Sequence, residues 1–578
     1  MSDQVTAKVR WDRFMNRFHA RLAGYSRPAG AFVTAPEPRT IGAFAKGRQL
    51  LAGNHQFAGH LVVASGTSIW DLGVNDPAFD HEIHGFTWLD DLASVGNPAA
   101  RNLAADWLWD WIDRYGNGTG PAWTPDLTGR RLIRWINHAL FLLRGQESER
   151  SRSFYKSLSH QTRFLSRRWQ VAAPGLPRFE ALTGLIYAGL ALEGLGHLAE
   201  PAVKVLAKEC TKQIDAQGGL PTRNPQELLE VFTLLTWAAA ALSEADRPVP
   251  QVHLDAIDRI APSLRTLRHS DGSLARFHGG GRGSEGRLDH ALAASGVKTR
   301  QPDGLSMGFA RLSAGRTSII VDATAPPIGA ASTNAHASTL AFELTSGRRP
   351  MIVNCGSGAS FGPDWRRAGR ATPSHSTLSL DGYSSARLGN ADRISAREAL
   401  MDAPDHVPVE ISQAIDGVRF QGGHNGYAKT HGLTHARTLE LTFDGRGLAG
   451  EDLLLALEDA DRRRYDRAIA RAGVPGIPYD IRFHLHPEVE VREDLSGRAI
   501  SILLKSGEVW VFRSESLPLR LEPSVYLEAG RLKPRATKQI VLSGQTEGHA
   551  TRVRWSLSKP QETAIGVRDL VREELPVA

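Results

Sequence analysis

The sequence predicts an α+β protein of two domains, with helices up to about residue 300 and an antiparallel β-sandwich after it. The chain has 578 residues, which is too long for one ordinary core. Apolar residues recur every three or four positions in the first part, as in helices, and every second position in the second part, as in strands. Turn residues separate the strand-like segments. We therefore expect domains at 1–300 and 301–578.

The helical domain is predicted from segments of similar length joined by short loops rich in Gly and Pro. Such helices form antiparallel hairpins, and these curl into a bundle, a toroid or a solenoid. The predicted helices are 101–114, 129–143, 154–169, 179–195, 202–216, 226–242 and 254–267. The Gly-rich stretch 277–291 is predicted to be a linker or gating loop between the domains.

The second domain is predicted from short alternating segments separated by turns, the pattern of antiparallel sheets stacked in a sandwich. The segment VRWSL, with Val553, Trp555 and Leu557 on one face, is an example. The predicted strands are 316–321, 340–344, 378–380, 439–443, 481–485, 509–512, 540–542 and 553–557.

Composition and charge narrow the function classes. The hydrophobic fraction of 41% is typical of a globular protein, and no apolar run approaches the length of a membrane span. The charged N-terminus lacks the apolar core of a signal peptide, so we expect a cytoplasmic protein. Two distant cysteines, Cys210 and Cys355, predict neither a disulfide framework nor a zinc motif. The net charge of +7 favours an anionic partner, but no Lys/Arg block indicates nucleic-acid binding.

Three stretches of the helical domain carry polar residues suited to a binding cleft. The candidates are Arg134, Trp135, Asn137 and His138 in RRLIRWINHALFLL, Tyr187 in GLIYAGLAL, and Arg223 and Asn224 in GGLPTRNPQELLE. Each has a structural alternative: Asn137 and His138 can decorate a helix, Tyr187 can belong to the core, and Asn224 can be a helix cap. Arginines bind carboxylates or sulfates through two hydrogen bonds, and tryptophans such as Trp135 and Trp88 can stack on sugars.

In the second domain, polar residues flank a predicted hairpin. The stretch NAHASTLAFELTSGRRPMIVNCG reads as strand, turn and strand, with His336 before the first strand and Asn354 after the second. In ATPSHSTLSLDG, His375 also precedes a strand. Two histidines at strand starts and Asn354 at a strand end can converge on one cation.

These motifs and their order resemble the heparinase II/III family of polysaccharide lyases, over nearly the whole chain. Family members typically read His-x-His-Ala-Asp, a strand, a turn and Val-Asp-x-Gly, then His-Asn-Thr before a strand ending in Asp-Gly. The matching strings here run from Asn334 to Ser338, from Val353 to Gly356, from His375 to Thr377, and Asp381 with Gly382. The early segment HGFTWLDDL adds to the resemblance. It implies an incomplete (α/α) toroid followed by the β-sandwich.

The resemblance also implies roles. Catalysis is expected from Asn137, His138, Tyr187 and Asn334. Side-chain chemistry, rather than the resemblance, predicts substrate binding by Arg134, Trp135, Arg223 and Asn224. A structural divalent metal, zinc or calcium, is expected at His336, Asn354 and His375. Two departures stand out: Asn334 replaces a catalytic histidine, and Asn354 replaces a metal-binding carboxylate. Because a carboxamide is a poorer ligand, we expect metal affinity to be reduced or absent, unless a carboxylate such as Asp381 compensates.

The leading hypothesis is a lyase that cleaves an acidic, uronate-containing polysaccharide or oligosaccharide by β-elimination. Neutralising the uronate carboxylate makes its C5 proton removable, and a His–Tyr pair can act as base and acid. The alternative is a non-catalytic or weakly active protein that binds acidic glycans. A glycoside hydrolase would need a pair of carboxylates that these motifs lack. The family resemblance adds a periplasmic location as an alternative to the cytoplasm. The oligomeric state is not determined by the sequence.

Overall fold

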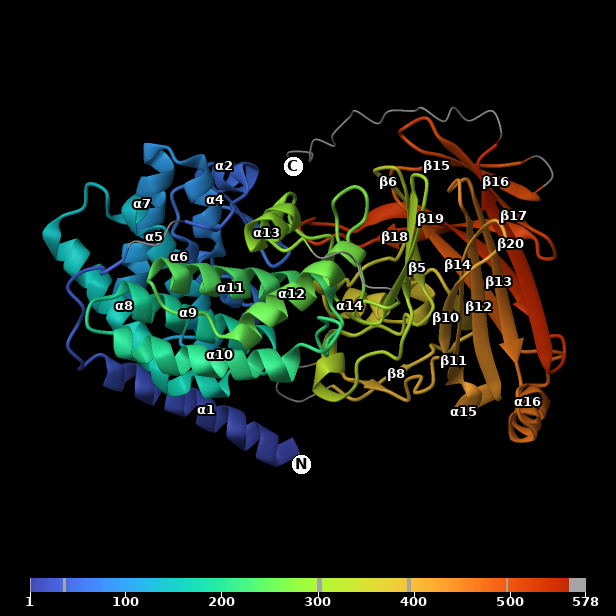
Figure 1. The fold of residues 1–578 in the computed structure, drawn as a ribbon, viewed down its shortest axis with the longest axis horizontal. Coiled ribbons are helices and arrows are strands. Elements are labelled where there is room, and N and C mark those ends of the chain that lie inside the picture. The colour runs from blue at the N-terminus through green and yellow to red at the C-terminus, as the bar shows by residue number, and fades with distance from the viewer. Residues whose placement is uncertain (1, 35–37, 299–303, 392–396, 495–496, 561–578) are drawn as a thin grey trace.

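The computed structural model describes residues 2–34, 38–298, 304–391, 397–494 and 497–560. Figure 1 shows a helical half followed by a half built of β-sheets, in the predicted order. The helices of the first half are α1 (Ser2–Ala23), α2 (Phe44–Leu51), α3 (Pro77–His84), α4 (Thr87–Val95), α5 (Pro98–Tyr115), α6 (Pro125–Asn137), α7 (Ala139–Leu143), α8 (Ser148–Arg168), α9 (Leu176–Ala191), α10 (Ala199–Gln213), α11 (Pro225–Glu244), α12 (Gln251–Thr266) and α13 (Arg287–Ser295).

Local sequence explains where the central helices begin and how closely they pack. Helices α6 and α11 each have proline in the first turn, and the Asn224 side chain caps α11 by accepting from the backbone N–H groups of Gln226 and Glu227. Helices α6 and α9 cross at two glycines. A Cβ atom on Gly184 would lie 2.4 Å from the Gly129 Cα, so larger residues would force these helices apart. This crossing sets α6 beside α9, the helix that carries Tyr187.

Some elements differ from the predicted ones. The predicted helix 129–143 is broken at His138, which separates α6 from α7. A small hairpin of β1 (Asn54–Phe57) and β2 (His60–Val63) lies within the helical half. The predicted linker 277–291 contains the start of α13, and its loop packs against both halves: Gly279 donates to His336, and Gly281 donates to Gln226. The segment thus lies between the halves as predicted, and these contacts hold it in place.

The second half consists of two large antiparallel sheets with minor elements. One has the order β10-β11-β12-β13-β20-β17-β16-β15, and the other has the order β18-β19-β14-β6-β5-β4-β3 with β7 paired to β14. The strands are β3 (Phe309–Ala314), β4 (Thr317–Asp322), β5 (Phe342–Ser346), β6 (Arg349–Val353), β7 (Leu378–Leu380), β8 (Arg387–Leu388), β9 (Leu400–Met401), β10 (Val409–Gln413), β11 (Gly417–Tyr427), β12 (Leu433–Thr442), β13 (Gly447–Leu455), β14 (Pro478–Leu485), β15 (Glu490–Glu493), β16 (Ala499–Leu503), β17 (Val509–Ser514), β18 (Leu519–Tyr526), β19 (Arg535–Gln545) and β20 (Ala550–Ser558), and the helices are α14 (Pro363–Gly369), α15 (Ala428–His431) and α16 (Asp459–Ala472).

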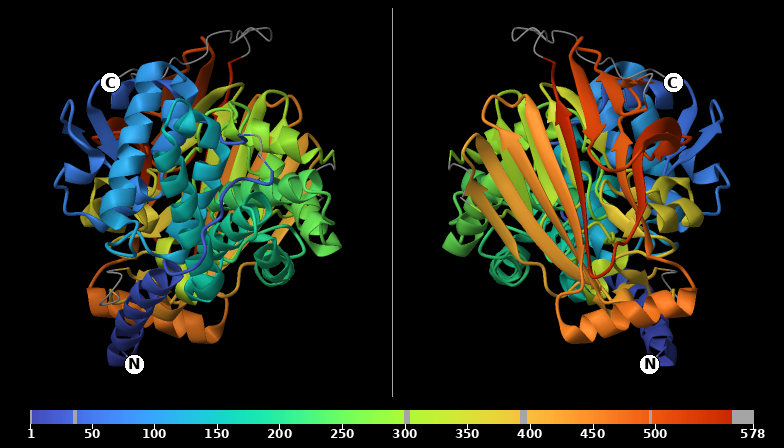
Figure 2. Two further views of the ribbon diagram at one scale, coloured as in Figure 1. Left: turned by 90° about the vertical axis from the view of Figure 1, so that its left-hand side faces the viewer. Right: turned by 90° about the vertical axis from the view of Figure 1, so that its right-hand side faces the viewer.

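Figure 2 shows the two sheets face to face, seen from the side of the β-domain. An apolar core lies between them. Phe342 of one sheet lies parallel to Trp555 of the other, with ring centroids 6.1 Å apart, and Phe483 contacts Phe512 at 4.8 Å. The alternation of Val553, Trp555 and Leu557 points all three into this core. The predicted sandwich is confirmed, and its hairpin β5–β6 brings the polar motif to the face of the helical half.

Candidate functional site

One group of candidate residues lies in the helical half, where Arg134 and Asp90 line a small pocket. His138 lies at the break between α6 and α7, and its Nε2 is 2.9 Å from both Asp90 Oδ1 and Thr40 Oγ1. Asp90 Oδ2 accepts a hydrogen bond from Arg134 Nε at 3.0 Å. Burial alone would raise the pKa of the Asp90 carboxyl, but Arg134 and His138 together lower it below its usual value. The pocket therefore contains a buried, ionised Asp90 that orients His138.

Asn137 precedes His138 and is almost fully buried, with 3% of its surface exposed. Within the described residues, neither Oδ1 nor Nδ2 of its side chain has a hydrogen-bond partner. A buried amide is normally satisfied, so an amide of this kind can receive a water molecule or a polar group of a ligand. Asn137 therefore retains free hydrogen-bonding capacity on both polar atoms of its side chain.

Tyr187 projects from α9 into the protein interior. It is 0% exposed, and its hydroxyl donates to the Trp237 carbonyl oxygen at 3.4 Å. Burial raises the pKa of this phenol to about 12, although Arg39 nearby partly opposes the shift. The neighbouring pocket, which Arg39, Thr40, Asp90, Arg134, Thr233, Trp237, Arg287 and His290 line among others, has a volume of about 20 Å³. That space holds about one water molecule and no sugar ring.

A second group lies where the β5–β6 hairpin meets the helical half. The His336 and His375 imidazoles are in contact, as predicted, with His336 Nδ1 3.0 Å from His375 Nε2. Gly279 N–H donates to His336 Nε2 at 3.1 Å, so the His336 proton lies on Nδ1 and points to His375. His375 Nδ1 donates in turn to the Ala371 carbonyl oxygen at 2.9 Å. Burial lowers the pKa of His375 to about 4, so both rings fit a neutral hydrogen-bonded chain.

These residues do not fit a metal ion. All four ring nitrogens of His336 and His375 are used in the hydrogen-bonded chain. The Asn354 side chain is also engaged, because its Oδ1 accepts from the Ser376 N–H at 3.0 Å and its Nδ2 faces Glu343. In the part of the chain that the structure describes, no group of three His, Cys, Asp or Glu side chains is arranged to hold a metal. Reduced metal affinity stays a prediction, which elemental analysis of untagged protein tests.

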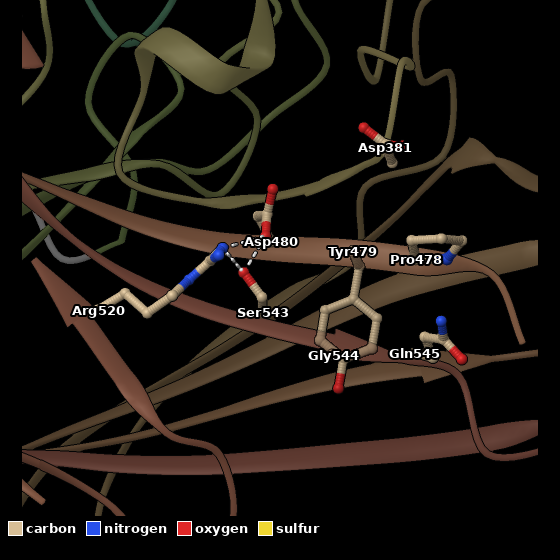
Figure 3. Close-up of a pocket in the computed structure, with 8 residues that line it drawn as sticks. All are labelled: Asp381, Pro478, Tyr479, Asp480, Arg520, Ser543, Gly544 and Gln545. Carbon is tan, nitrogen blue, oxygen red and sulfur yellow. Dashed lines mark hydrogen bonds and ion pairs between the residues drawn. The ribbon is translucent and has the colours of Figure 1, made fainter. Parts of the chain in front are cut away.

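Asp381 does not compensate for the missing carboxylate. Figure 3 shows it at the rim of a separate pocket of about 370 Å³ over β14 and β19, lined also by Tyr479, Asp480 and Arg520. Neither His336 nor His375 lines this pocket. The suggestion that Asp381 supports the histidine pair is therefore wrong, because the end of β7 carries Asp381 away from His375 at its start.

Asn334 is the one exposed residue of the predicted catalytic set. Its Oδ1 accepts from Arg366 at 3.2 Å. It lies beside Gly279, because a Cβ atom there would be 3.0 Å from Asn334 Cβ and 3.7 Å from Asn224 Nδ2. The structure thus brings Asn334 together with Asn224 at the junction of the two halves.

Comparison with known proteins identifies this arrangement. The sequence pattern of the heparinase II/III-like C-terminal domain matches residues 296–556. This chain therefore contains a heparinase II/III-like C-terminal domain. Its fold is similar to that of a solved heparinase III, with a TM-score of 0.65 at 13% identity over 93% of this chain and 88% of that one. It is also similar to the heparan sulfate lyase HepC of Pedobacter heparinus, with a TM-score of 0.54 at 14% identity over 97% and 91%. The helical half is accordingly the toroid and the second half the sandwich of this lyase fold.

A further relative has a different name. FtsZ-localized protein C of Caulobacter vibrioides is 29% identical over 551 residues, which cover 94% of this chain and 92% of that protein.

Three predicted substrate-binding residues have structural roles instead. Trp135 is 0% exposed and packs between Phe154 and Trp111, so it cannot stack on a sugar. Arg223 donates to the carbonyl oxygens of Met307 and Gly308 and to Asp322, which leaves no fork for a substrate carboxylate. The Asn224 Oδ1 caps α11. Trp88 is likewise in the core.

Sequence reasoning missed Asp90, Thr40 and Arg366. Asp90 belongs to the segment HGFTWLDDL on α4. Spacing alone could not show that Asp90 is buried, because aspartates on a helix are usually exposed. Thr40 and Arg366 come from loop and short-helix positions that have no periodic signal. Only the contacts with His138 and Asn334 identify them.

Proposed function

We propose that this heparinase II/III-like protein has kept the lyase fold as a binding scaffold and lost efficient β-elimination. The observation that carries the proposal is the state of the expected acid–base pair. Asn334 stands where the family has a histidine, and an amide neither accepts nor releases a proton near neutral pH. Tyr187 is fully buried with its hydroxyl directed at Trp237, out of reach of a glycan. General acid–base catalysis needs both groups within hydrogen-bond reach of the substrate.

The location of the protein forms a second part of the proposal. The relative from Caulobacter vibrioides, similar over nearly the whole of both chains, is named for its localisation with FtsZ. We propose the same localisation for this chain, and with it a cytoplasmic location. No described helix is long and apolar enough to cross a membrane.

A lyase acting on a uronate-containing glycan remains the second candidate. One observation favours it: the free amide of Asn137 lies beside the His138–Asp90 pair, and a group of this kind can neutralise a uronate carboxylate. Substrate would then have to open the pocket, since its present volume of about 20 Å³ excludes a sugar.

Turnover assays distinguish the two candidates. The full chain is incubated with heparan sulfate, chondroitin sulfate and alginate, and the unsaturated product is followed by its absorbance at about 232 nm. We expect no increase for the wild type, nor for Asn334→His, because Tyr187 stays buried in both. An active heparinase on the same glycan stocks is the control. A rise that Tyr187→Phe abolishes would contradict the scaffold proposal and establish the lyase.

Imaging tests the localisation. A fluorescent fusion is expressed in its native host together with labelled FtsZ, and FtsZ is then depleted. We expect the fusion to coincide with FtsZ and to disperse after depletion. A fusion that is diffuse from the start would refute this part of the proposal without affecting the turnover result.

A further inference from the structure

Helix α1 packs on the protein with the face that carries its small and polar residues. Its buried residues are Asn16, Ala20 and Ala23. Arg168 of α8 donates to Asn16 Oδ1 at 2.8 Å, and His160 of the same helix hydrogen-bonds to the Ala20 carbonyl oxygen. In Figure 1 the helix runs along the lower edge of the toroid and ends free at the N-terminus. Among the described side chains of α1, the fully buried ones that hold the helix to the protein include no large apolar residue.

The large apolar residues of α1 lie on the opposite face. Trp11 is 60% exposed, Phe14 57%, Phe18 50% and Leu22 43%. The spacing of three, four and four residues places all of them on one stripe of the helix. Tyr25, three residues further and 90% exposed, follows the helix end. A surface helix of a globular protein normally buries its apolar stripe, so this reversal indicates an interaction surface.

Cations border the stripe. Arg10, Arg13, Arg17 and Arg21 are all exposed and follow the same spacing, so they form a row along one edge. Lys8 is exposed near the other edge. Among the described side chains of the helix the acid is Asp12, which pairs with Arg168 on the buried side at 3.2 Å. The exposed face is thus aromatic in the middle and positively charged at its border.

We propose that α1 lies in the surface of a lipid membrane that contains anionic headgroups. The aromatic side chains would enter the boundary between headgroups and acyl chains, and the arginine row would pair with lipid phosphates. Aromatic residues on one face with Lys and Arg beside them are typical of interfacial helices. The helix axis then runs parallel to the membrane, which matches its position along the edge of the toroid.

The charges disfavour the other occupants of such a surface. In a symmetric pair of chains joined through this stripe, the arginine rows of both copies would come close, and like charges repel. Nucleic acid would use the arginine row but would leave the exposed Phe14, Phe18 and Leu22 without an apolar partner.

Vesicle sedimentation of the full chain tests the proposal. Vesicles of phosphatidylglycerol and phosphatidylcholine are compared with vesicles of phosphatidylcholine alone, for the wild type, Phe14→Gln/Phe18→Gln and Arg13→Gln/Arg17→Gln. The control is Leu140→Gln/Ile415→Gln, which removes two apolar residues that are 81% and 96% exposed elsewhere. All substituted side chains are exposed, so circular dichroism and thermal unfolding should remain as in the wild type.

We expect sedimentation with the anionic vesicles, a loss of binding of at least about tenfold for both α1 variants, and no change for the control. Added salt should weaken binding. Equal binding by the α1 variants and the wild type, or no sedimentation of the wild type, would overturn the proposal. So would a dimer in light scattering that Phe14→Gln/Phe18→Gln dissociates, or capture by duplex DNA in place of vesicles.

Discussion

At the scale of single residues, the histidine pair is engaged in hydrogen bonds. His336 and His375 lie as close as two ligands of one ion, yet each nitrogen is used by a hydrogen bond. The prediction of reduced metal affinity rests on Asn354. A carboxylate there would attract a cation, whereas the amide donates towards Glu343 and accepts from Ser376, which satisfies the site internally.

The neutral pair predicts a pH dependence of stability. Burial lowers the pKa of His375 to about 4, whereas in the unfolded chain the pKa returns to its ordinary value of 6.5. Between these values the unfolded state binds more protons, so stability is full above pH 6.5 and falls as the pH decreases towards 4. Each such histidine contributes a slope of roughly 1 kcal/mol per pH unit.

Urea unfolding at several pH values measures this slope for the wild type and His375→Gln. We expect the slope below pH 6.5 to be smaller in the variant, because one titrating group is gone. The buried His253 and His484, whose pKa values are also lowered by burial, should keep the remaining slope positive. An unchanged slope would mean that His375 is already protonated in the folded protein.

At the scale of elements, helix α6 ends at the candidate site of the toroid, and its buried face packs in an aromatic core. Trp135 contacts Phe86, Trp111 and Phe154, so the helix is held by aromatic packing while His138 marks its end. The buried Arg131 adds a hydrogen bond to Gln161 of α8 at 2.7 Å. The helix positions His138 because these contacts leave it little freedom to rotate.

Truncation of Trp135 separates a core role from a sugar-stacking role. Because the ring is fully buried, Trp135→Ala should lower the free energy of unfolding by about 3–5 kcal/mol. Trp11→Ala, where the ring is 60% exposed, should change it by less than about 0.5 kcal/mol. Chemical denaturation followed by circular dichroism measures both. A mild effect of Trp135→Ala together with lost glycan binding would restore the sequence-based assignment.

At the scale of the whole molecule, Arg223 is one of the residues that join the two halves. Arg223 leaves the start of α11 and reaches β3 and β4 of the sandwich, where it donates to Asp322 at 2.7 Å and lies over the Phe309 ring. Asp322 is completely buried and also accepts from Ser338 at 2.6 Å. The ion pair thus fixes the β-domain, with Asn334 and the histidine pair, against the toroid.

Loss of this arginine should uncouple the halves. Arg223→Gln leaves Asp322 buried without its cation, for which a cost of about 3–5 kcal/mol is expected, and calorimetry should show two transitions in place of one. The matched control is Arg268→Gln, which breaks the exposed pair with Asp289 and should cost less than about 1 kcal/mol. A single transition at the wild-type temperature for Arg223→Gln would show that other contacts join the domains.

Helical periodicity in the first half, alternation in the second and the motif positions could be read from the sequence, because periodicity and turn residues act over a few neighbouring residues. Val553, Trp555 and Leu557 face the core as their alternation predicts, and His336 and His375 meet because both precede strands of one sheet. Only the tertiary structure decided what each polar or aromatic side chain faces. Trp135 and Tyr187 have the same spacing whether their helix face meets a cleft or the core, and burial comes from segments far away in the chain. Arg223 satisfies carbonyl oxygens about a hundred residues later, a partnership that no local pattern encodes.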